Sequence, residues 1–181
     1  MSHPAKPLIE TPRLILREFE LDDAFDIYKL NADPEVIRYT GDPPFETVES
    51  ARDFLNNYKD YENNGFGRWA VIKKDSNAFI GWCGLKLNEQ NLIDIGFRFF
   101  RGEWNKGYAT EAAKACLEYG FMDLNIKEII GRVAMKNTAS IKVLEKLSME
   151  YWKKDSCKGI ENSLYYKISK EQYLKNTKTS F

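Results

Sequence analysis

The chain has 181 residues, and its 27 Lys plus Arg balance its 27 Asp plus Glu to a formal net charge of zero. With 43% hydrophobic and 30% charged residues it has the composition of a folded globular domain, which excludes a disordered or fibrous chain. Because its charges balance, the chain lacks the clustered basic excess that is typical of proteins that bind nucleic acid or anionic membranes. We therefore expect neither partner.

The first half of the chain predicts a strand, two helices and a three-stranded meander. Residues 8–19 favour a strand, and an acidic start at 21–23 opens a helix with apolar residues at helical spacing. Paired prolines within residues 40–45 exclude a helix there and predict a stiff loop. An acidic helix over 46–62 follows. Short polar connections then join three antiparallel strands, at residues 68–73, 78–87 and 92–100.

The second half changes to helix, strand, helix. The spacing predicts helices over 107–122 and 138–147 around a strand over 128–134, an order that requires parallel pairing with a right-handed crossover. We therefore predict one domain over residues 8–168. Two further strands are expected at residues 151–154 and 163–168, followed by a short helix with a tail at residues 169–181. Residues 1–7 are expected to form a flexible N-terminus.

Cysteine and histidine usage narrows the chemistry. Cys83, Cys116 and Cys157 are too few and too scattered for a disulfide framework, which predicts a reducing compartment. Residues 1–7 hold no signal-peptide core, and no apolar run approaches the roughly 18 residues of a membrane span, so we expect a cytoplasmic protein. The single histidine, His3, lies in the predicted flexible terminus. The chain therefore has no other histidine for a Ser-His-Asp triad, a Cys-His pair or a His-rich metal site.

The turn between the strand 92–100 and the helix 107–122 carries the main functional signal. A helix N-terminus leaves about four backbone N–H groups unpaired and has a partial positive charge, so it suits a phosphate group. Gly107 lets the backbone approach an anion, Ala109 keeps the next turn slim, and Lys106 could add charge. The turn matches neither GxxxxGK[ST] nor GxGxxG. The alternative is a helix that merely packs tightly on a sheet.

Five segments in the same order resemble the GNAT superfamily, the Gcn5-related N-acetyltransferases, and within it the branch of ribosomal-protein alanine acetyltransferases. They begin at residues 8, 80, 94, 104 and 137 and read LIETPRLILR, IGWCGL, DIGFR, WNKGYATEA and NTASIKVLEKL. Three residues depart from the family pattern: Trp104 opens the loop, Ser148 stands where a glycine commonly ends the last helix, and Asp94 replaces a common Glu. Element order and resemblance together predict a mixed α/β, GNAT-like fold with a seven-stranded, mostly antiparallel sheet, one parallel pair and helices on both faces.

The resemblance implies acetyl transfer from acetyl-coenzyme A, without a metal, to the primary amine of a small molecule or a protein N-terminus, by direct attack in a ternary complex. Ser140 would protonate the departing thiolate, whose pKa is about 8.5, and Asn137 three residues earlier would orient Ser140 or bind pantetheine. Asp94 is a candidate general base, with another carboxylate or a bound water left open. The implied coenzyme contacts are Phe97, Arg98, Phe99, Trp104, Asn105, Lys106, Gly107, Tyr108, Ala109, Thr110, Asn137 and Ser140.

Each of these residues also has a plain structural interpretation. Asn137 and Ser140 could form only a helix cap and a solvated hydroxyl, because Asn and Ser favour such positions. Asp94 could be a solvated strand residue, since a carboxylate needs burial or a partner to become a tuned base. Lys106 could be an ordinary surface lysine.

Two alternatives concern the whole protein. It could be a coenzyme A-binding or sensing protein with weak turnover, or a structural domain whose loop holds no phosphate. The acceptor stays open as well, because the loop 40–45 and the helix 46–62 would select it and their shape does not follow from sequence. Monomer and homodimer both remain open.

Overall fold

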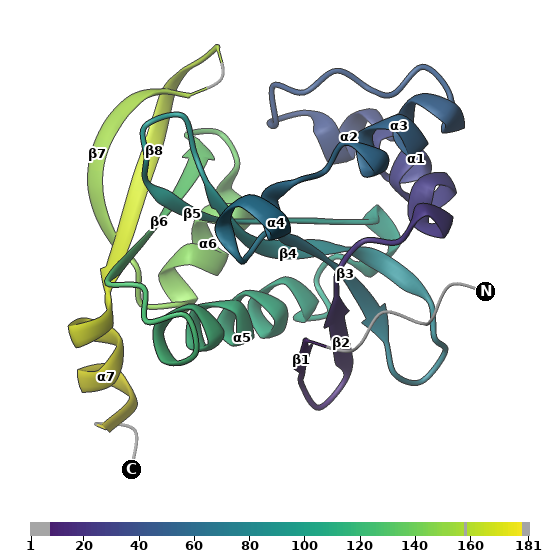
Figure 1. Ribbon diagram of the computed structural model, residues 1–181. Coiled ribbons are helices and arrows are strands. Elements are labelled where there is room, and N and C mark those ends of the chain that lie inside the picture. The colour runs from purple at the N-terminus through teal and green to yellow at the C-terminus, as the bar shows by residue number, and fades with distance from the viewer. Residues whose placement is uncertain (1–7, 158, 179–181) are drawn as a thin grey trace.

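An eight-stranded mixed sheet forms the centre of the computed structural model, which describes residues 8–157 and 159–178 (Figure 1). The strand order is β1-β2-β3-β4-β5-β6-β8-β7, and neighbouring strands are antiparallel except β5 and β6, which are parallel. The strands are β1 (Ile9–Glu10), β2 (Leu14–Arg17), β3 (Arg68–Lys73), β4 (Phe79–Leu87), β5 (Ile93–Phe99), β6 (Glu128–Ala134), β7 (Glu150–Cys157) and β8 (Ile160–Ser169).

Helices cover both faces of this sheet, as Figure 1 shows, with α1 to α3 on one side and α5 and α6 on the other. The larger core lies under α5, where Ala112, Cys116 and Phe121 are fully buried against the sheet. The helices are η1 (Leu21–Asp23), α1 (Ala24–Ala32), α2 (Pro34–Ile37), α3 (Val48–Asn56), α4 (Asp60–Asn64), η2 (Arg101–Glu103), α5 (Tyr108–Met122), α6 (Thr138–Lys146) and α7 (Lys170–Lys178).

The predicted mixed α/β fold with one parallel pair is confirmed, but the strand count of seven is wrong. Residues 8–19 hold a tight hairpin rather than one strand, because the Thr11 amide donates to the Leu14 carbonyl at 3.0 Å and reverses the chain around Pro12. The predicted helix over 46–62 is likewise two helices. The Asn57 side chain donates to the Asp53 carbonyl at 2.8 Å and ends the first of them.

Most other elements follow the prediction. The strands at 68–73 and 128–134 and the helix over 107–122 are confirmed, while the last two strands are longer than expected and pair as far as Cys157 with Ile160. The helix α2 was not predicted; Asp33 caps it by accepting from the Glu35 amide at 3.0 Å. Ser148, in the glycine position after α6, adopts a left-handed φ of 59°.

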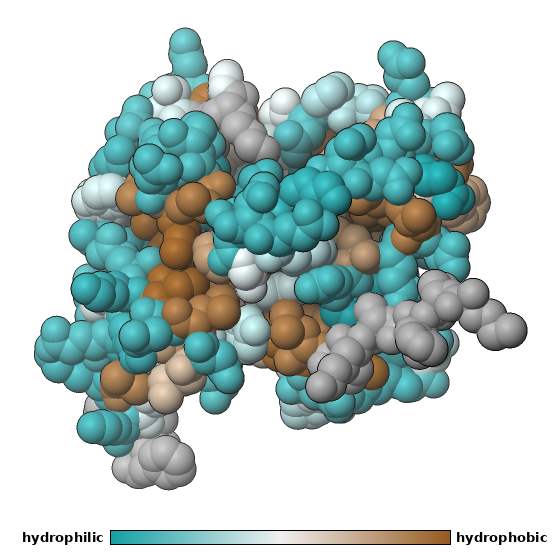
Figure 2. Space-filling model, in the orientation of Figure 1, coloured by the Kyte–Doolittle hydropathy of each residue, from teal (hydrophilic) through white to brown (hydrophobic). Residues whose placement is uncertain are grey.

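Some predictions fall on other parts of the chain. The flexible N-terminus 1–7, with His3, and the end of the tail at 179–181 lie outside the described residues. The single domain over 8–168 stays a prediction. Within residues 8–157 and 159–178, no helix combines the length and the apolar character needed to cross a bilayer. Hydrophilic side chains cover much of the face in Figure 2, and hydrophobic areas show between them, the largest on the left of this view.

Candidate active site

The N-terminus of α5 presents backbone amides to solvent. Asn105 and Gly107 both adopt left-handed conformations, with φ of 61° and 83°, and Gly107 is the N-cap residue of the helix. The Glu111 amide donates to the Gly107 carbonyl at 3.0 Å, so the amides of residues 108–110 have no carbonyl partner within the helix. Residues 104–107 are exposed, and the positive end of the helix dipole lies here, so the turn can hold an anion. We call residues 104–110 the α5 loop.

Side chains of the β1–β2 hairpin hold the α5 loop in place. The Arg13 guanidinium donates to the Lys106 carbonyl at 2.9 Å and pairs with Glu111 at 2.6 Å. Glu111 also accepts from the Thr11 hydroxyl at 2.6 Å. Burial raises the pKa of Glu111, but the hydrogen bonds from Thr11 and Arg13 outweigh it and leave this pKa below its ordinary value.

Three predicted coenzyme residues of the loop have partners within the protein. The Trp104 indole N–H donates to the Phe99 carbonyl at 2.9 Å, and the Lys106 ammonium lies 3.1 Å from the Glu103 carboxylate. The Tyr108 ring is buried, with the Arg13 guanidinium carbon 4.4 Å from its centroid. The loop therefore offers mainly backbone amides to a ligand.

The parallel pair of strands separates soon after it forms. Among the described residues, the last pair between β5 and β6 is Ile95 with Gly131. Both strands continue beyond this pair, β5 to Phe99 and β6 to Ala134. The remaining edge of β5 is therefore left without a strand partner.

The register of β4 and β5 shows which amides face that gap. Residues of an antiparallel pair alternate between bonding across the pair and pointing away from it. The Phe100 amide donates to the Ile80 carbonyl at 3.0 Å, and the register continues without a shift along β5. Alternation therefore turns the amides of Phe97 and Phe99 towards β6. It directs the amide of Arg98 to β4, so the amides that face the gap are those of Phe97 and Phe99.

A cleft of about 520 Å³ lies at this gap. Its wall combines β5, β6 and α6 with the loop 40–45 and the side chains of α1 and α3. No residue of the α5 loop lines the cleft. The loop follows the carboxyl end of β5 in the chain, and other residues of β5 do line the cleft. The predicted site residues that line the cleft are Asp94, Phe97, Arg98, Asn137 and Ser140.

Asn137 and Ser140 are half-buried in the cleft wall at the start of α6. The Asn137 carboxamide oxygen accepts from the Ser140 backbone amide at 3.2 Å and caps the helix. The capping interpretation is therefore confirmed for Asn137, and this bond reaches the backbone of Ser140 rather than its hydroxyl.

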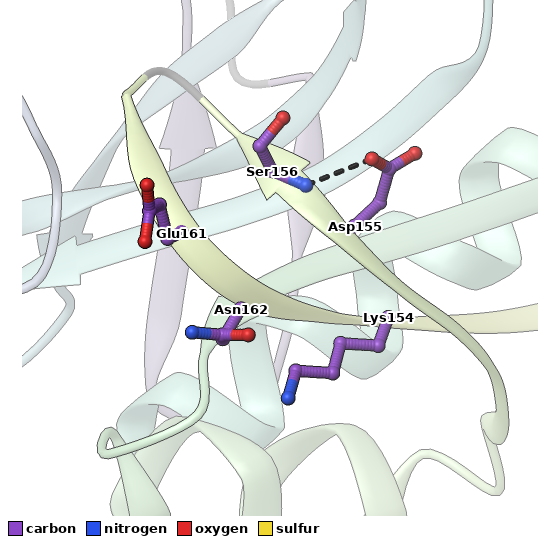
Figure 3. Close-up of a pocket in the computed structure, with 5 residues that line it drawn as sticks. All are labelled: Lys154, Asp155, Ser156, Glu161 and Asn162. Atoms are coloured by element: carbon purple, nitrogen blue, oxygen red, sulfur yellow. Dashed lines mark hydrogen bonds between the residues drawn. The ribbon is translucent and has the colours of Figure 1, made fainter.

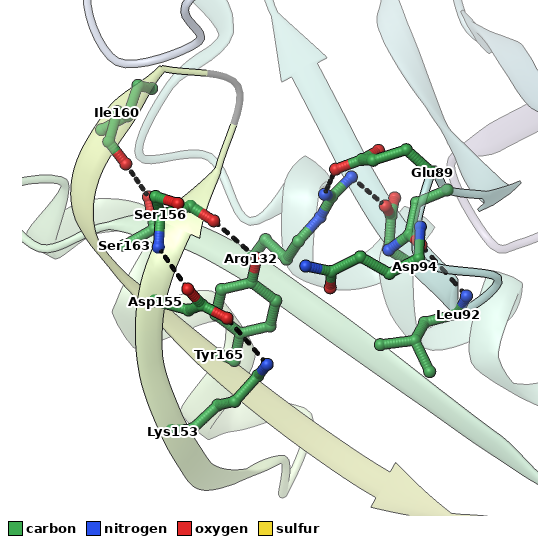
Figure 4. Close-up of polar contacts among 12 residues, drawn as sticks. Glu89, Leu92, Asp94, Arg132, Lys153, Asp155, Ser156, Ile160, Ser163 and Tyr165 are labelled. Carbon is green, nitrogen blue, oxygen red and sulfur yellow. Dashed lines mark hydrogen bonds and ion pairs between the residues drawn. The ribbon is translucent and has the colours of Figure 1, made fainter.

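Asp94 is buried between two arginines. Its carboxylate accepts from Arg68 of β3 and, at 2.6 Å, from Arg132 of β6, the contact that Figure 4 shows. Arg68 also donates to the backbone carbonyls of Gly84 and Asp94, at 2.6 and 3.0 Å. It fills the space above Gly96, where an added Cβ would lie 2.7 Å from the guanidinium carbon. Both Asp94 oxygens thus have guanidinium partners, and Asp94 links β3 to β6 where β5 and β6 begin to separate.

The Arg98 side chain crosses from the sheet to the helical side of the cleft. It donates to the Asn31 carboxamide of α1 and pairs with Asp42 at 2.8 Å, which fixes the loop 40–45 against β5. Burial lowers the pKa of Arg98 from its ordinary value, and the bond to Asp42 opposes that change. The guanidinium carbons of Arg98 and Arg68 lie 5.2 and 5.5 Å from the Trp82 ring.

The sequence alone did not indicate a role for Arg68, Asp42 or Arg132. They come from β3, the loop after α2, and β6, so no local motif joins them. One signal was present: a glycine inside a strand often marks a close approach, and the Arg68 guanidinium occupies the place where a side chain at Gly96 would lie.

Two other places contribute nothing to this site. Cys83 and Cys116 are free, buried thiols with sulfurs 3.6 Å apart, and burial raises the pKa of Cys116, which opposes thiolate chemistry. A shallow pocket at the β7–β8 hairpin is lined by polar side chains from those two strands (Figure 3). No group of three metal-ligating His, Cys, Asp or Glu side chains occurs within the part of the chain that the structure describes.

Comparisons with known proteins agree with this arrangement. A family model of the GNAT acetyltransferase domain matches residues 13–150. The uncharacterized N-acetyltransferase p20 of Bacillus licheniformis is 38% identical over 143 residues, which cover 77% of this chain and 80% of that protein. A GNAT-family acetyltransferase structure from Bacillus anthracis is 34% identical, with a TM-score of 0.76 over 90% of this chain and 98% of its own.

A more distant structure shares the same fold. The spermidine N-acetyltransferase of Vibrio cholerae, solved in complex with CoA and spermine, is 22% identical to this chain. Its TM-score is 0.77, and the match covers 91% of this chain and 99% of that one.

Proposed function

Since the chain belongs to the GNAT family and is an N-acetyltransferase, we propose that it moves the acetyl group of acetyl-coenzyme A to the primary amine of a small molecule, by direct attack in a ternary complex. The observation that carries the proposal is the gap between β5 and β6, with unpaired strand amides on one wall and Ser140 on another. The Vibrio cholerae relative, described with CoA and spermine, supports a coenzyme A thioester and a small amine as the substrate classes.

The donor would lie along β5. The amides of residues 108–110 and Gly107 would hold the pyrophosphate, because the helix dipole and unpaired N–H groups favour an anion there. Phe97 and Phe99 would donate backbone hydrogen bonds to pantetheine and to the thioester carbonyl oxygen. Acetyl-coenzyme A would supply the activated acyl carbon, and these residues would aim it into the cleft.

Two protons must move in this reaction, one away from the amine and one to the departing thiolate. The attacking amine must be neutral; its nitrogen would form a bond to the acyl carbon, and the proton that the nitrogen then loses would leave through water in the open cleft. The bond between the acyl carbon and sulfur then breaks, and the Ser140 hydroxyl would donate a proton to the thiolate and regain one from water. Because the thiol has a pKa near 8.5, this donor assists the step without having to be strongly acidic.

For Asp94 we propose a positioning role. A general base needs an oxygen within hydrogen-bond reach of the proton that it removes, and both Asp94 oxygens already accept from guanidinium groups. The same bonds hold β3, β5 and β6 in place around the gap. Asp94 would thus fix where the strands separate, rather than take a proton from the amine.

The test is acceptor-dependent release of free thiol from acetyl-coenzyme A by the purified protein. Ser140→Ala should lower kcat by about 100-fold or more, as expected for loss of a general acid, and leave the Kd of coenzyme A nearly unchanged. The matched control is Thr138→Ala, which removes an exposed hydroxyl from the same helical turn. An unchanged kcat in Ser140→Ala would remove the donor role.

The alternative of a sensing protein has a distinct signature in the same assay. Calorimetry would show coenzyme A binding, while no amine would release thiol above the rate in buffer. Loss of binding altogether would favour a structural domain. A cytoplasmic location stays part of the proposal, supported by the scattered cysteines, and cell fractionation would test it.

A further inference from the structure

The ion pairs of the cleft leave its wall without a surplus of either charge. The largest group of charges joins β3, β5 and β6, where the Asp94 carboxylate accepts from Arg68 and Arg132. Glu89 pairs with the same Arg132 at 2.5 Å and supplies a second carboxylate. Two cations therefore face two carboxylates in this group.

Two further pairs complete the balance. Arg98 pairs with Asp42 at 2.8 Å, and the Lys86 ammonium lies 3.8 Å from the Asp60 carboxylate. Every charged side chain among the described residues of the wall thus contacts an opposite charge. A ligand with a second charge would have to displace one of these partners or stay unpaired, and an unpaired charge in a poorly solvated site is costly.

The helical side of the cleft is aromatic. Phe54 lies 5.6 Å from both Phe45 and Tyr58 between ring centroids, and Phe19 lies 5.5 Å from Tyr58. All four rings line the cleft, and so does Ser140 at the start of α6. The proposed proton donor and an aromatic surface therefore belong to one cleft.

Phe54 is the ring of this surface that the protein leaves most open. It is 41% exposed, and of the large hydrophobic residues that are exposed in the described part of the chain, it alone lines the cleft. Exposed apolar side chains in a concave site mark a place for an apolar part of a ligand. A ligand ring would gain more than an aliphatic group here, because rings prefer edge-to-face or offset contacts at centroid separations of about 4.5 to 7 Å.

We infer that the acceptor is a primary monoamine that carries an aromatic side group and no second charge. The inference rests on the proposed function. The ligand ring would lie against Phe54, Phe45 and Tyr58, and the amine would point towards the gap between β5 and β6. A polyamine or an amino acid would instead bring an ammonium or a carboxylate into a wall whose charges are already paired.

Three pairs of acceptors test the inference by thiol release, with rates corrected to the concentration of neutral amine. 2-Phenylethylamine and ethylamine differ by one ring, and kcat/KM should favour the aromatic amine by about 10- to 100-fold, as expected for burial of a phenyl group. L-Phenylalanine adds a carboxylate to 2-phenylethylamine, and 1,4-diaminobutane adds an ammonium to butylamine. Each added charge should lower kcat/KM by about tenfold or more.

Two results would overturn the inference. One is an equal kcat/KM for 2-phenylethylamine and ethylamine. The other is a charged acceptor that reacts as well as its counterpart without that charge, or better.

A binding measurement separates the inference from the transfer reaction. In the presence of coenzyme A, calorimetry should show N-acetyl-2-phenylethylamine binding about 10- to 100-fold tighter than N-ethylacetamide, which lacks the ring. Tighter binding of the aromatic analogue, without thiol release from any amine, would support the aromatic site and overturn the transfer. Thiol release with equal or undetectable binding of both analogues would support the transfer and overturn the aromatic site.

A variant of the exposed ring locates the contact. Phe54→Ala should lower the preference for 2-phenylethylamine over ethylamine by about 2- to 10-fold, the effect expected for one aromatic pair. Phe54→Leu keeps most of the apolar volume and should give an intermediate preference. The matched control is Phe25→Ala, because Phe25 is 55% exposed on α1 and lies outside the cleft wall.

Thermal unfolding checks that each variant folds, and the KM for acetyl-coenzyme A serves as an internal control. Phe25→Ala should keep the preference of the natural protein. A folded Phe54→Ala or Phe54→Leu variant that keeps the full preference would contradict the inference.

Discussion

The α5 loop and the cleft are two parts of one site built by different means. The loop is a continuous, exposed stretch of residues 104–110 that offers backbone amides and is held by the Arg13–Glu111 pair. The cleft gathers side chains from strands, helices and a loop that are far apart in sequence, and its guanidinium side chains are only 8% to 15% exposed. The loop thus depends on backbone conformation, whereas the cleft depends on buried charge.

Because of this difference, we expect the loop and the cleft to respond to different kinds of substitution. Changes of side chain in the loop should matter little unless they alter its φ and ψ angles, because the donors are main-chain groups. Changes of charge in the cleft should affect folding and catalysis together, because an unpaired buried charge is costly.

The largest expected effect is in the cleft. Asp94→Asn should lower the free energy of unfolding by about 3 kcal/mol, because it leaves Arg68 and Arg132 without their shared charge. Glu89→Gln is the matched control, since it removes the exposed partner of the same Arg132 and should cost less than about 0.5 kcal/mol. Urea unfolding measures both. The pH dependence of residual kcat/KM tests the role: an acid limb that disappears in Asp94→Asn would identify Asp94 as the base.

The loop should respond to backbone strain. Gly107→Ala places a side chain at φ 83°, which costs about 1 kcal/mol, and brings a Cβ within 3.3 Å of the Arg13 guanidinium. We expect the Kd of coenzyme A to rise about tenfold as the amides turn. Gly65→Ala is the control, with φ of 77° and open space around the new Cβ. Equal coenzyme affinity in the two variants, measured by calorimetry, would contradict the backbone model.

The smallest expected effect concerns the ion pair that holds the loop. Glu111→Gln should lower the free energy of unfolding by about 1 kcal/mol at pH 7, because the Arg13–Glu111 pair is partly exposed. The pKa of Glu111 is below its ordinary value of 4.5 when folded, so the folded state binds fewer protons. The stabilisation is therefore complete above about pH 4.5 and is lost as the pH falls through the folded pKa.

Urea unfolding of the natural protein and Glu111→Gln between pH 7 and pH 3 would follow that loss. The two proteins should converge in acid. Glu10→Gln, which affects an exposed carboxylate paired with Lys74, should show a smaller difference at every pH. A constant difference across the range would show that hydrogen bonding to neutral Glu111 suffices.

Much of the fold followed from local patterns. The helix over 107–122 and the strand 128–134 were predictable because apolar spacing and alanine content act over neighbouring residues. The hairpin around Pro12 and the break at Asn57 were missed. Each depends on a few side-chain and turn hydrogen bonds, at Thr11 and at Asn57, that the average pattern does not reveal.

The sequence alone determined the α5 loop, because a strand end, a glycine and a helix start are consecutive residues and the donors belong to the backbone. It also determined that Asn137 begins a helix. Only the tertiary structure decided that Asp94 lies between Arg68 and Arg132 and that Arg98 reaches Asp42. Those contacts join residues whose spacing carries no periodic signal. Their positions follow from strand register and from the space above Gly96, which exist only after the sheet has formed.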